Sequence, residues 1–125
     1  MSKPVSARNA RTKNPNDSYF SKLQSPQWQK VRLKVFERAD WMCMSCGETL
    51  KPLTVHHGLY RYGDEPWELP EDTLWCLCED CHLVLQDQLS DLKLELGRTH
   101  PLDYERVMTE ILEVKRKRRN NRRAK

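Results

Sequence analysis

Apolar residues recur at helical spacing in the first third of the chain, at Trp28, Val31, Val35 and Phe36. A spacing of three and four residues lines one face of a helix, and it predicts a helix that runs to about Ala39. The dipeptide Ser25-Pro26 comes before this segment. Serine is a good N-cap and proline suits the first helical position, so we expect the helix to begin there.

Two further helices are predicted in the C-terminal half. The first is expected from about Glu79 to Leu96, with Gly97 as the residue that ends it. Thr99 and Pro101 then open a final helix. Its apolar side consists of Leu102, Val107, Met108, Ile111, Leu112 and Val114. We expect this helix to continue into the basic C-terminal tail.

Two short strands are predicted between the first two helices. Residues 50–57 follow the first cysteine pair, and there Leu53 and Val55 alternate with Thr54 and His56. Residues 74–77 predict the second strand. Residues 58–72 carry Gly and Pro at several positions and read as a loop. The chain is therefore expected to be a small α+β domain, preceded by a flexible basic arm over residues 1–24.

The net charge of +4 conceals an uneven distribution. Residues 1–13 carry four basic residues and no acidic one, at Lys3, Arg8, Arg11 and Lys13. The last eleven residues carry eight more, at Lys115, Arg116, Lys117, Arg118, Arg119, Arg122, Arg123 and Lys125. Basic ends of this kind favour nucleic-acid phosphates, although a solvated tail is the plainer interpretation. No stretch approaches the roughly 20 apolar residues of a membrane span.

Four of the five cysteines form two CxxC pairs, Cys43 with Cys46 and Cys78 with Cys81. Each pair can offer two thiolates to one side of a zinc ion, so the spacing predicts a structural zinc site with four cysteine ligands. A small core benefits from such an ion. A disulfide framework is the alternative, but the N-terminus resembles no signal peptide, and we expect a reducing cytoplasm. Cys76 is expected to be a small buried hydrophobe rather than an alternative ligand.

Two histidines, His56 and His57, lie between the cysteine pairs, and His82 follows the second pair directly. Adjacent residues on a strand point to opposite faces, so one imidazole can face a metal while the other faces a substrate. His82 falls in the first turn of the predicted helix. His56 and His82 are therefore candidate ligands of a second metal ion, in addition to the zinc held by sulfur.

The run Val55-His56-His57, followed by Leu74 to His82, resembles the zinc-knuckle branch of the HNH endonucleases, with its ββα-metal fold. The helix that begins at Ser25 and the loop of residues 60–68 are similar to that branch as well. On this resemblance residues 25–97 form the HNH-like domain, and residues 98–125 add a C-terminal helix and tail. The resemblance also suggests a bacterial or phage-encoded protein.

The resemblance implies a role for each histidine. His57 matches the general base that deprotonates the attacking water, and His56 and His82 match ligands of a catalytic divalent ion. That ion would be magnesium, manganese, nickel or zinc. Thr73 stands where the family has a central asparagine, and it can still donate a hydrogen bond. Gln86 stands where many members have a further histidine ligand.

The function expected from these residues is metal-dependent hydrolysis of phosphodiester bonds in DNA. Arg61 and the basic residues 115–123 would hold phosphates, although Arg61 can equally pair with Asp64 or Glu65. Tyr60, Tyr62 and Trp67 could stack on unpaired bases, but packing beneath the loop is favoured. The alternative function is a catalytically weak module that binds nucleic acid or a protein partner, as monomer or dimer. Thr73 and Gln86 are the residues that favour it.

Overall fold

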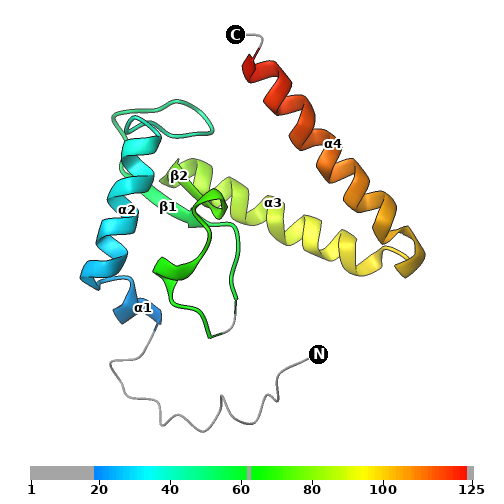
Figure 1. Ribbon diagram of the computed structural model, residues 1–125, viewed down its shortest axis with the longest axis horizontal. Coiled ribbons are helices and arrows are strands. Elements are labelled where there is room, and N and C mark those ends of the chain that lie inside the picture. Colours follow the sequence, from blue (N-terminus) through cyan, green and yellow to red (C-terminus); the bar gives the residue numbers. More distant parts are fainter. Residues whose placement is uncertain (1–18, 62, 124–125) are drawn as a thin grey trace, which may run out of the picture. The chain divides into compact units, whose positions relative to one another are not determined.

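The computed structural model of the protein describes residues 19–61 and 63–123 (Figure 1). Its helices are α1 (Tyr19–Lys22), α2 (Pro26–Arg38), α3 (Glu79–Arg98) and α4 (Tyr104–Arg123), its 3-10 turns are η3 (Pro66–Glu68), η4 (Glu71–Thr73) and η5 (Pro101–Asp103), and its strands are β1 (Leu53–His57) and β2 (Leu74–Cys78). The chain divides into two compact units, one ending at Leu85 and the other beginning at Gln86. The first unit has a ββα-like arrangement, since β1 pairs with β2 and β2 runs directly into α3.

The predicted helices and strands are confirmed, with two corrections. Tyr19–Lys22 is helical, although we expected residues 1–24 to be a flexible arm; the rest of that prediction, for residues 1–18, lies outside the described part of the chain. Gly97 does not end α3, which continues to Arg98. The last turn is closed instead by Thr99, whose backbone N–H donates to Leu96 O and whose hydroxyl donates to Glu95 O at 2.8 Å.

The strands form an antiparallel hairpin that packs on α2 in the first unit. The register places Val55 opposite Cys76 and His56 opposite Trp75. One core cluster joins the hairpin to α2 and contains Trp28, Val35, Phe36, Val55, Leu74 and Cys76. Cys76 is fully buried there, which confirms its expected role as a small hydrophobe.

Both ends of α2 lie where the sequence predicts, with Ser25 as the N-cap and Ala39 as the C-cap. The hydroxyl of Ser25 accepts a hydrogen bond from Trp28 N at 3.2 Å, which caps the helix. At the other end Asp40 and Trp41 have φ of 54° and 58°. Trp41 N donates to Phe36 O and Asp40 N donates to Glu37 O, the paired hydrogen bonds of a Schellman motif. The Phe36 and Trp41 rings lie 5.4 Å apart and provide its hydrophobic contact.

Replacing Asp40 with glycine should stabilise the fold by about 0.5–1 kcal/mol. Asp40 occupies the left-handed position that glycine adopts without steric cost, and an L-residue there loses roughly that much. Chemical denaturation of the zinc-loaded protein measures the change. Lys34→Gly, on an exposed position inside α2, is the matched control and should destabilise by about 1 kcal/mol. A loss of stability in Asp40→Gly would contradict the assigned cap.

Arg38 fastens the end of α2 to the segment that begins β2. Its guanidinium donates to Leu74 O at 2.7 Å and to Glu71 O at 3.1 Å. Two carbonyls at the start of the strand thereby gain a charged donor. This use of Arg38 is structural. Among the described residues, none of the helices is both long and apolar enough to cross a membrane.

Candidate metal centre and histidine pair

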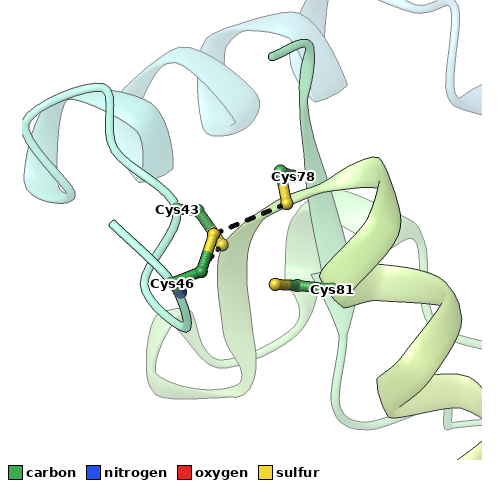
Figure 2. A group of neighbouring side chains, drawn as sticks. All are labelled: Cys43, Cys46, Cys78 and Cys81. Atoms are coloured by element: carbon green, nitrogen blue, oxygen red, sulfur yellow. Dashed lines mark hydrogen bonds between the residues drawn. The ribbon is translucent and has the colours of Figure 1, made fainter. Parts of the chain in front are cut away.

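All four paired cysteines meet at one point in the first unit (Figure 2). Cys43 and Cys46 come from the loop after α2, Cys78 ends β2, and Cys81 lies in the first turn of α3. Their sulfur atoms all lie within 4.8 Å of one another. Figure 2 shows the four side chains pointing inward from the two sides. The predicted cluster of four thiols is present, and it can hold a metal ion such as zinc.

The loop after α2 is shaped by backbone hydrogen bonds that bring its two sulfurs to one side. Gly47 N donates to Cys43 O at 2.9 Å, and Cys43 N donates to Glu48 O at 3.0 Å. Gly47 has φ of 80°, which only glycine adopts freely, so this position makes the tight turn possible. Met44 N donates to Cys76 O at 2.8 Å and joins the loop to β2. The loop is therefore held against the strand that carries Cys78.

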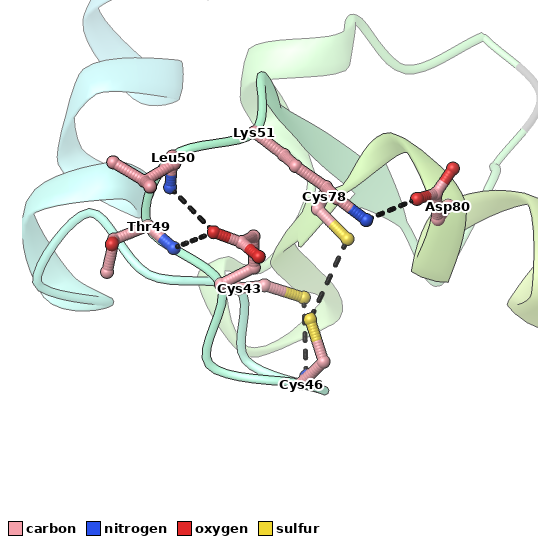
Figure 3. A network of polar contacts seen from close by, with 8 residues as sticks. Cys43, Cys46, Thr49, Leu50, Lys51, Cys78 and Asp80 are labelled. Carbon is pink, nitrogen blue, oxygen red and sulfur yellow. Dashed lines mark hydrogen bonds and ion pairs between the residues drawn. The ribbon is translucent and has the colours of Figure 1, made fainter.

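Side-chain contacts also connect the segments that surround the four thiols (Figure 3). Lys51 Nζ lies 2.6 Å from Asp80 Oδ2, which connects the segment before β1 with the first turn of α3. Glu48 Oε1 accepts hydrogen bonds from Thr49 N and Leu50 N. The Lys51–Asp80 pair is exposed and contributes little energy, so the geometry of the cluster depends mainly on the backbone.

The separation of the sulfur atoms suits a zinc ion with four ligands in a tetrahedral arrangement. A zinc ion with Zn–S bonds near 2.3 Å places its sulfur ligands about 3.8 Å apart. The Cys46 and Cys78 sulfurs are 3.8 Å apart. This spacing is too long for a disulfide, and all five cysteines are free thiols. The alternative of a disulfide framework is therefore not what the structure shows.

The thiols of the cluster influence one another's ionisation. Burial opposes ionisation of Cys43, but backbone N–H groups of Cys46, Cys78 and Ser45 favour its thiolate, and the net effect lowers the pKa of Cys43 to about 6. Contacts with the sulfurs of Cys78 and Cys46 raise the pKa of Cys81 to about 12. Four thiolates at this spacing repel one another unless a cation lies between them. The four thiols therefore ionise as one coupled group, and the cluster could hold a cation.

The structure brings His56 and His82 together. His56 lies on β1 and His82 is the fourth residue of α3, and their ring centroids are 5.3 Å apart at an interplanar angle of 65°. His56 is buried, and burial lowers its pKa below the ordinary value, with the charge of His82 as a second cause. The neutral imidazole that binds metals is therefore favoured at His56. Among the described residues this pair belongs to no group of three His, Cys, Asp or Glu whose ligand atoms all lie within 4.8 Å of one another.

His57 points to the opposite face of the hairpin, where it stacks on Trp28 with ring centroids 4.7 Å apart. The rings of Tyr60 and Tyr19 lie 5.5 Å and 6.1 Å from it. Its Nε2 is buried and finds no hydrogen-bond partner among the described residues. Burial lowers the pKa of His57 to about 4, with smaller contributions from His56 and His82. His57 is therefore neutral at physiological pH, and aromatic rings cover it.

The remaining predicted site residues lie apart from this cluster or are engaged elsewhere. The Thr73 hydroxyl donates to Pro70 O at 2.6 Å within η4. Arg61 pairs with Asp64 at 2.8 Å, one of the two acidic partners expected from the sequence. Gln86 lies one turn after His82 on α3. Trp67 packs against the core as expected, and Tyr62 lies outside the described residues.

The basic residues 115–123 all belong to α4 in the second unit, and all of them are exposed. Arg116 Nε donates to Glu113 Oε2 at 2.9 Å, and this contact raises the pKa of Arg116 further. The rest of the predicted tail, Ala124 and Lys125, lies outside the described residues. Nucleic-acid binding by this segment remains a prediction.

Sequence reasoning overlooked the residues that surround His57. Tyr19 falls in the segment expected to be a flexible arm, and Trp28 was assigned only to the apolar face of α2. The apolar spacing of α2 signals that Trp28 is buried, but it does not say which strand residue it meets. Only the packing of α2 on the hairpin brings Trp28 to His57.

Comparison with known proteins adds no relative: no family model, no curated protein and no solved structure matches the chain.

Proposed function

We propose that this protein is a metal-dependent endonuclease of the HNH type that hydrolyses phosphodiester bonds in DNA. The observation that supports the proposal is the 5.3 Å separation of the His56 and His82 rings. These two imidazoles come from β1 and α3, and α3 begins at the four-cysteine cluster. A ββα-like arrangement with two facing imidazoles is what the resemblance to HNH endonucleases implies.

In this proposal His56 and His82 hold one divalent ion. Such an ion would supply Lewis acidity at the scissile phosphate and would stabilise the leaving oxygen. Two protein ligands leave positions for phosphate oxygens and water, which magnesium or manganese would accept. The imidazole nitrogens themselves favour nickel or zinc. Burial of His56 keeps its imidazole neutral and available as a ligand.

His57 acts as the general base. Its neutral state at physiological pH leaves a ring nitrogen able to accept the proton of the attacking water. Within the described part of the chain Nε2 is buried and has no hydrogen-bond partner. Because the rings of Tyr19 and Tyr60 lie next to the imidazole, we expect one of them to move aside when a substrate binds. Tyr60 is 67% exposed, and its ring is therefore the easier of the two to displace.

The basic residues 115–123 would contact phosphates of the DNA backbone. Their positive charge attracts any sequence, because phosphate contacts position a protein without specifying a site. Arg61 would join them by exchanging its carboxylate partner Asp64 for a phosphate.

A binding module without catalysis is the second candidate. The buried position of His57 and the absence of a third close ligand among the described residues favour it. In that case the four-cysteine cluster maintains the fold, and the basic segment of α4 provides the contact with nucleic acid.

A titration with a second divalent ion separates the two functions. We expect the zinc-loaded protein to bind one further Mn²⁺ or Ni²⁺, measured by calorimetry or by the paramagnetic broadening of histidine NMR signals. His56→Ala and His82→Ala should each weaken this binding at least about tenfold, since each removes one of two ligands. His100→Ala is the matched control, because His100 is an exposed cap of η5 in the other unit.

The control variant should bind the second ion like the parent protein. Absence of any second ion in the parent would reject the nuclease and leave the binding module. Equal binding by all variants would show that the ion lies elsewhere.

A further inference from the structure

The second unit exposes more apolar surface than a stable unit of its size normally does. Among the described residues from Gln86 onward, none is buried. In α4 the exposed apolar side chains are Tyr104, Met108, Ile111, Leu112 and Val114, with exposed fractions from 43% to 68%. A segment this short cannot be stabilised by its own core, and contiguous exposed apolar surface marks an interaction site.

The apolar residues of α4 follow the spacing of a coiled-coil seam. Tyr104, Val107, Ile111 and Val114 are separated by three, four and three residues. Residues at such intervals form one narrow stripe that packs against another helix. The same register continues to Arg118, where the stripe becomes basic. The partner must therefore offer apolar surface in the middle and acidic groups at one end.

The charges along α4 are divided between its two halves. The N-terminal half carries Glu105, Glu110 and Glu113 and a single basic residue, Arg106. Residues 115–123 carry seven basic residues and no acidic one. A helix of 20 residues is about 30 Å long, so its two ends cannot meet within one chain. Glu113 already pairs with Arg116 of the same helix. A second α4 running in the opposite direction would bring Glu110 of each copy beside the basic half of the other.

We propose that α4 pairs antiparallel with α4 of a second copy of this chain. With Ile111 of each copy beside Val114 of the other, Glu110 flanks the seam close to Lys117 of the second copy, and Val107 continues the seam on both sides. Antiparallel pairing also aligns the helix dipoles favourably. DNA fits the apolar stripe of α4 less well. Its phosphates would be repelled by the acidic half of the helix and would make no favourable contact with the apolar side chains.

The dimer does not depend on the proposed nuclease activity. It places two copies of the histidine site in one assembly, and it leaves Arg116 and Arg123, off the stripe, to contact other molecules. Its expected signature is self-association of the full zinc-loaded chain, measured by sedimentation velocity and by light scattering after gel filtration.

Complementary charge-reversal variants test whether the partner of α4 is a second copy of the chain. One variant carries Glu110→Lys, and the other carries Lys117→Glu. Each variant alone should self-associate about tenfold more weakly or worse, because like charges face each other in its dimer. A mixture of the two should form dimers again, since unlike charges then meet on both sides. Zinc content and helical circular dichroism confirm that both variants are folded.

Ile111→Asp is a second disruption that removes the apolar centre of the seam, and it should give monomers that no mixture rescues. The proposal fails if the parent is monomeric at 100 µM protein (about a hundred times a micromolar Kd). It also fails if the two charge variants associate as tightly as the parent, or if their mixture stays monomeric while both are folded. Assemblies larger than dimers would overturn it too.

Discussion

Replacing Cys78 with serine should release zinc and unfold the unit that ends at Leu85, at a cost of about 10 kcal/mol or more in binding free energy. The buried part of this unit is small, and the four-cysteine cluster adjoins the two strands and α3. Without the ion, the remaining thiols of Cys43, Cys46 and Cys81 lie close together but make no interaction that stabilises the fold. Near-UV circular dichroism and elemental analysis of purified protein measure the loss.

Cys76→Ala is the matched control for this experiment. Cys76 lies on the same strand and is fully buried, but it belongs to the apolar core rather than to the cluster. Its replacement should cost about 1 kcal/mol and leave one zinc per chain. Equal zinc content and equal folding in Cys78→Ser and the parent would contradict the assigned metal centre.

Replacing His57 with alanine should reduce DNA cleavage by a factor of about 10² to 10⁴, the usual contribution of a general base. Zinc content should not change, because His57 faces α2 and not the cysteines. The rate of nicking of supercoiled plasmid by stoichiometrically zinc-loaded protein measures the effect.

His57→Phe separates chemistry from packing. A phenyl ring can preserve the stack on Trp28 but cannot accept a proton, so this variant should be as stable as the parent and as inactive as His57→Ala. Cleavage at the parental rate by His57→Phe would remove His57 from the mechanism, whatever the stability of the alanine variant.

Local rules were sufficient for most elements of the fold. Ser25 and Pro26 mark the start of α2 because capping depends only on neighbouring residues. Local rules did not predict features that depend on more than the neighbouring residues. Asp40 adopts a left-handed conformation, which aspartate adopts less readily than glycine. Gly97 lies inside α3 because hydrogen bonds from Thr99 close the last turn of the helix.

The candidate site was predictable to the extent that spacing controls it. Two CxxC pairs can meet around one ion in many folds, so the cysteine cluster could be inferred from the sequence. The alternation of strand residues likewise separates His56 from His57. The burial of His57 under Trp28, Tyr19 and Tyr60 could not be inferred, because it arises from contacts between segments that are far apart in sequence.

The most direct test of the account is the nicking of supercoiled plasmid by the zinc-loaded protein, with and without added Mg²⁺ or Mn²⁺. The account predicts nicked circles that appear only when the second ion is present, and far fewer of them with His82→Ala. Plasmid that stays supercoiled at every ion concentration, with a folded protein containing one zinc, would contradict it.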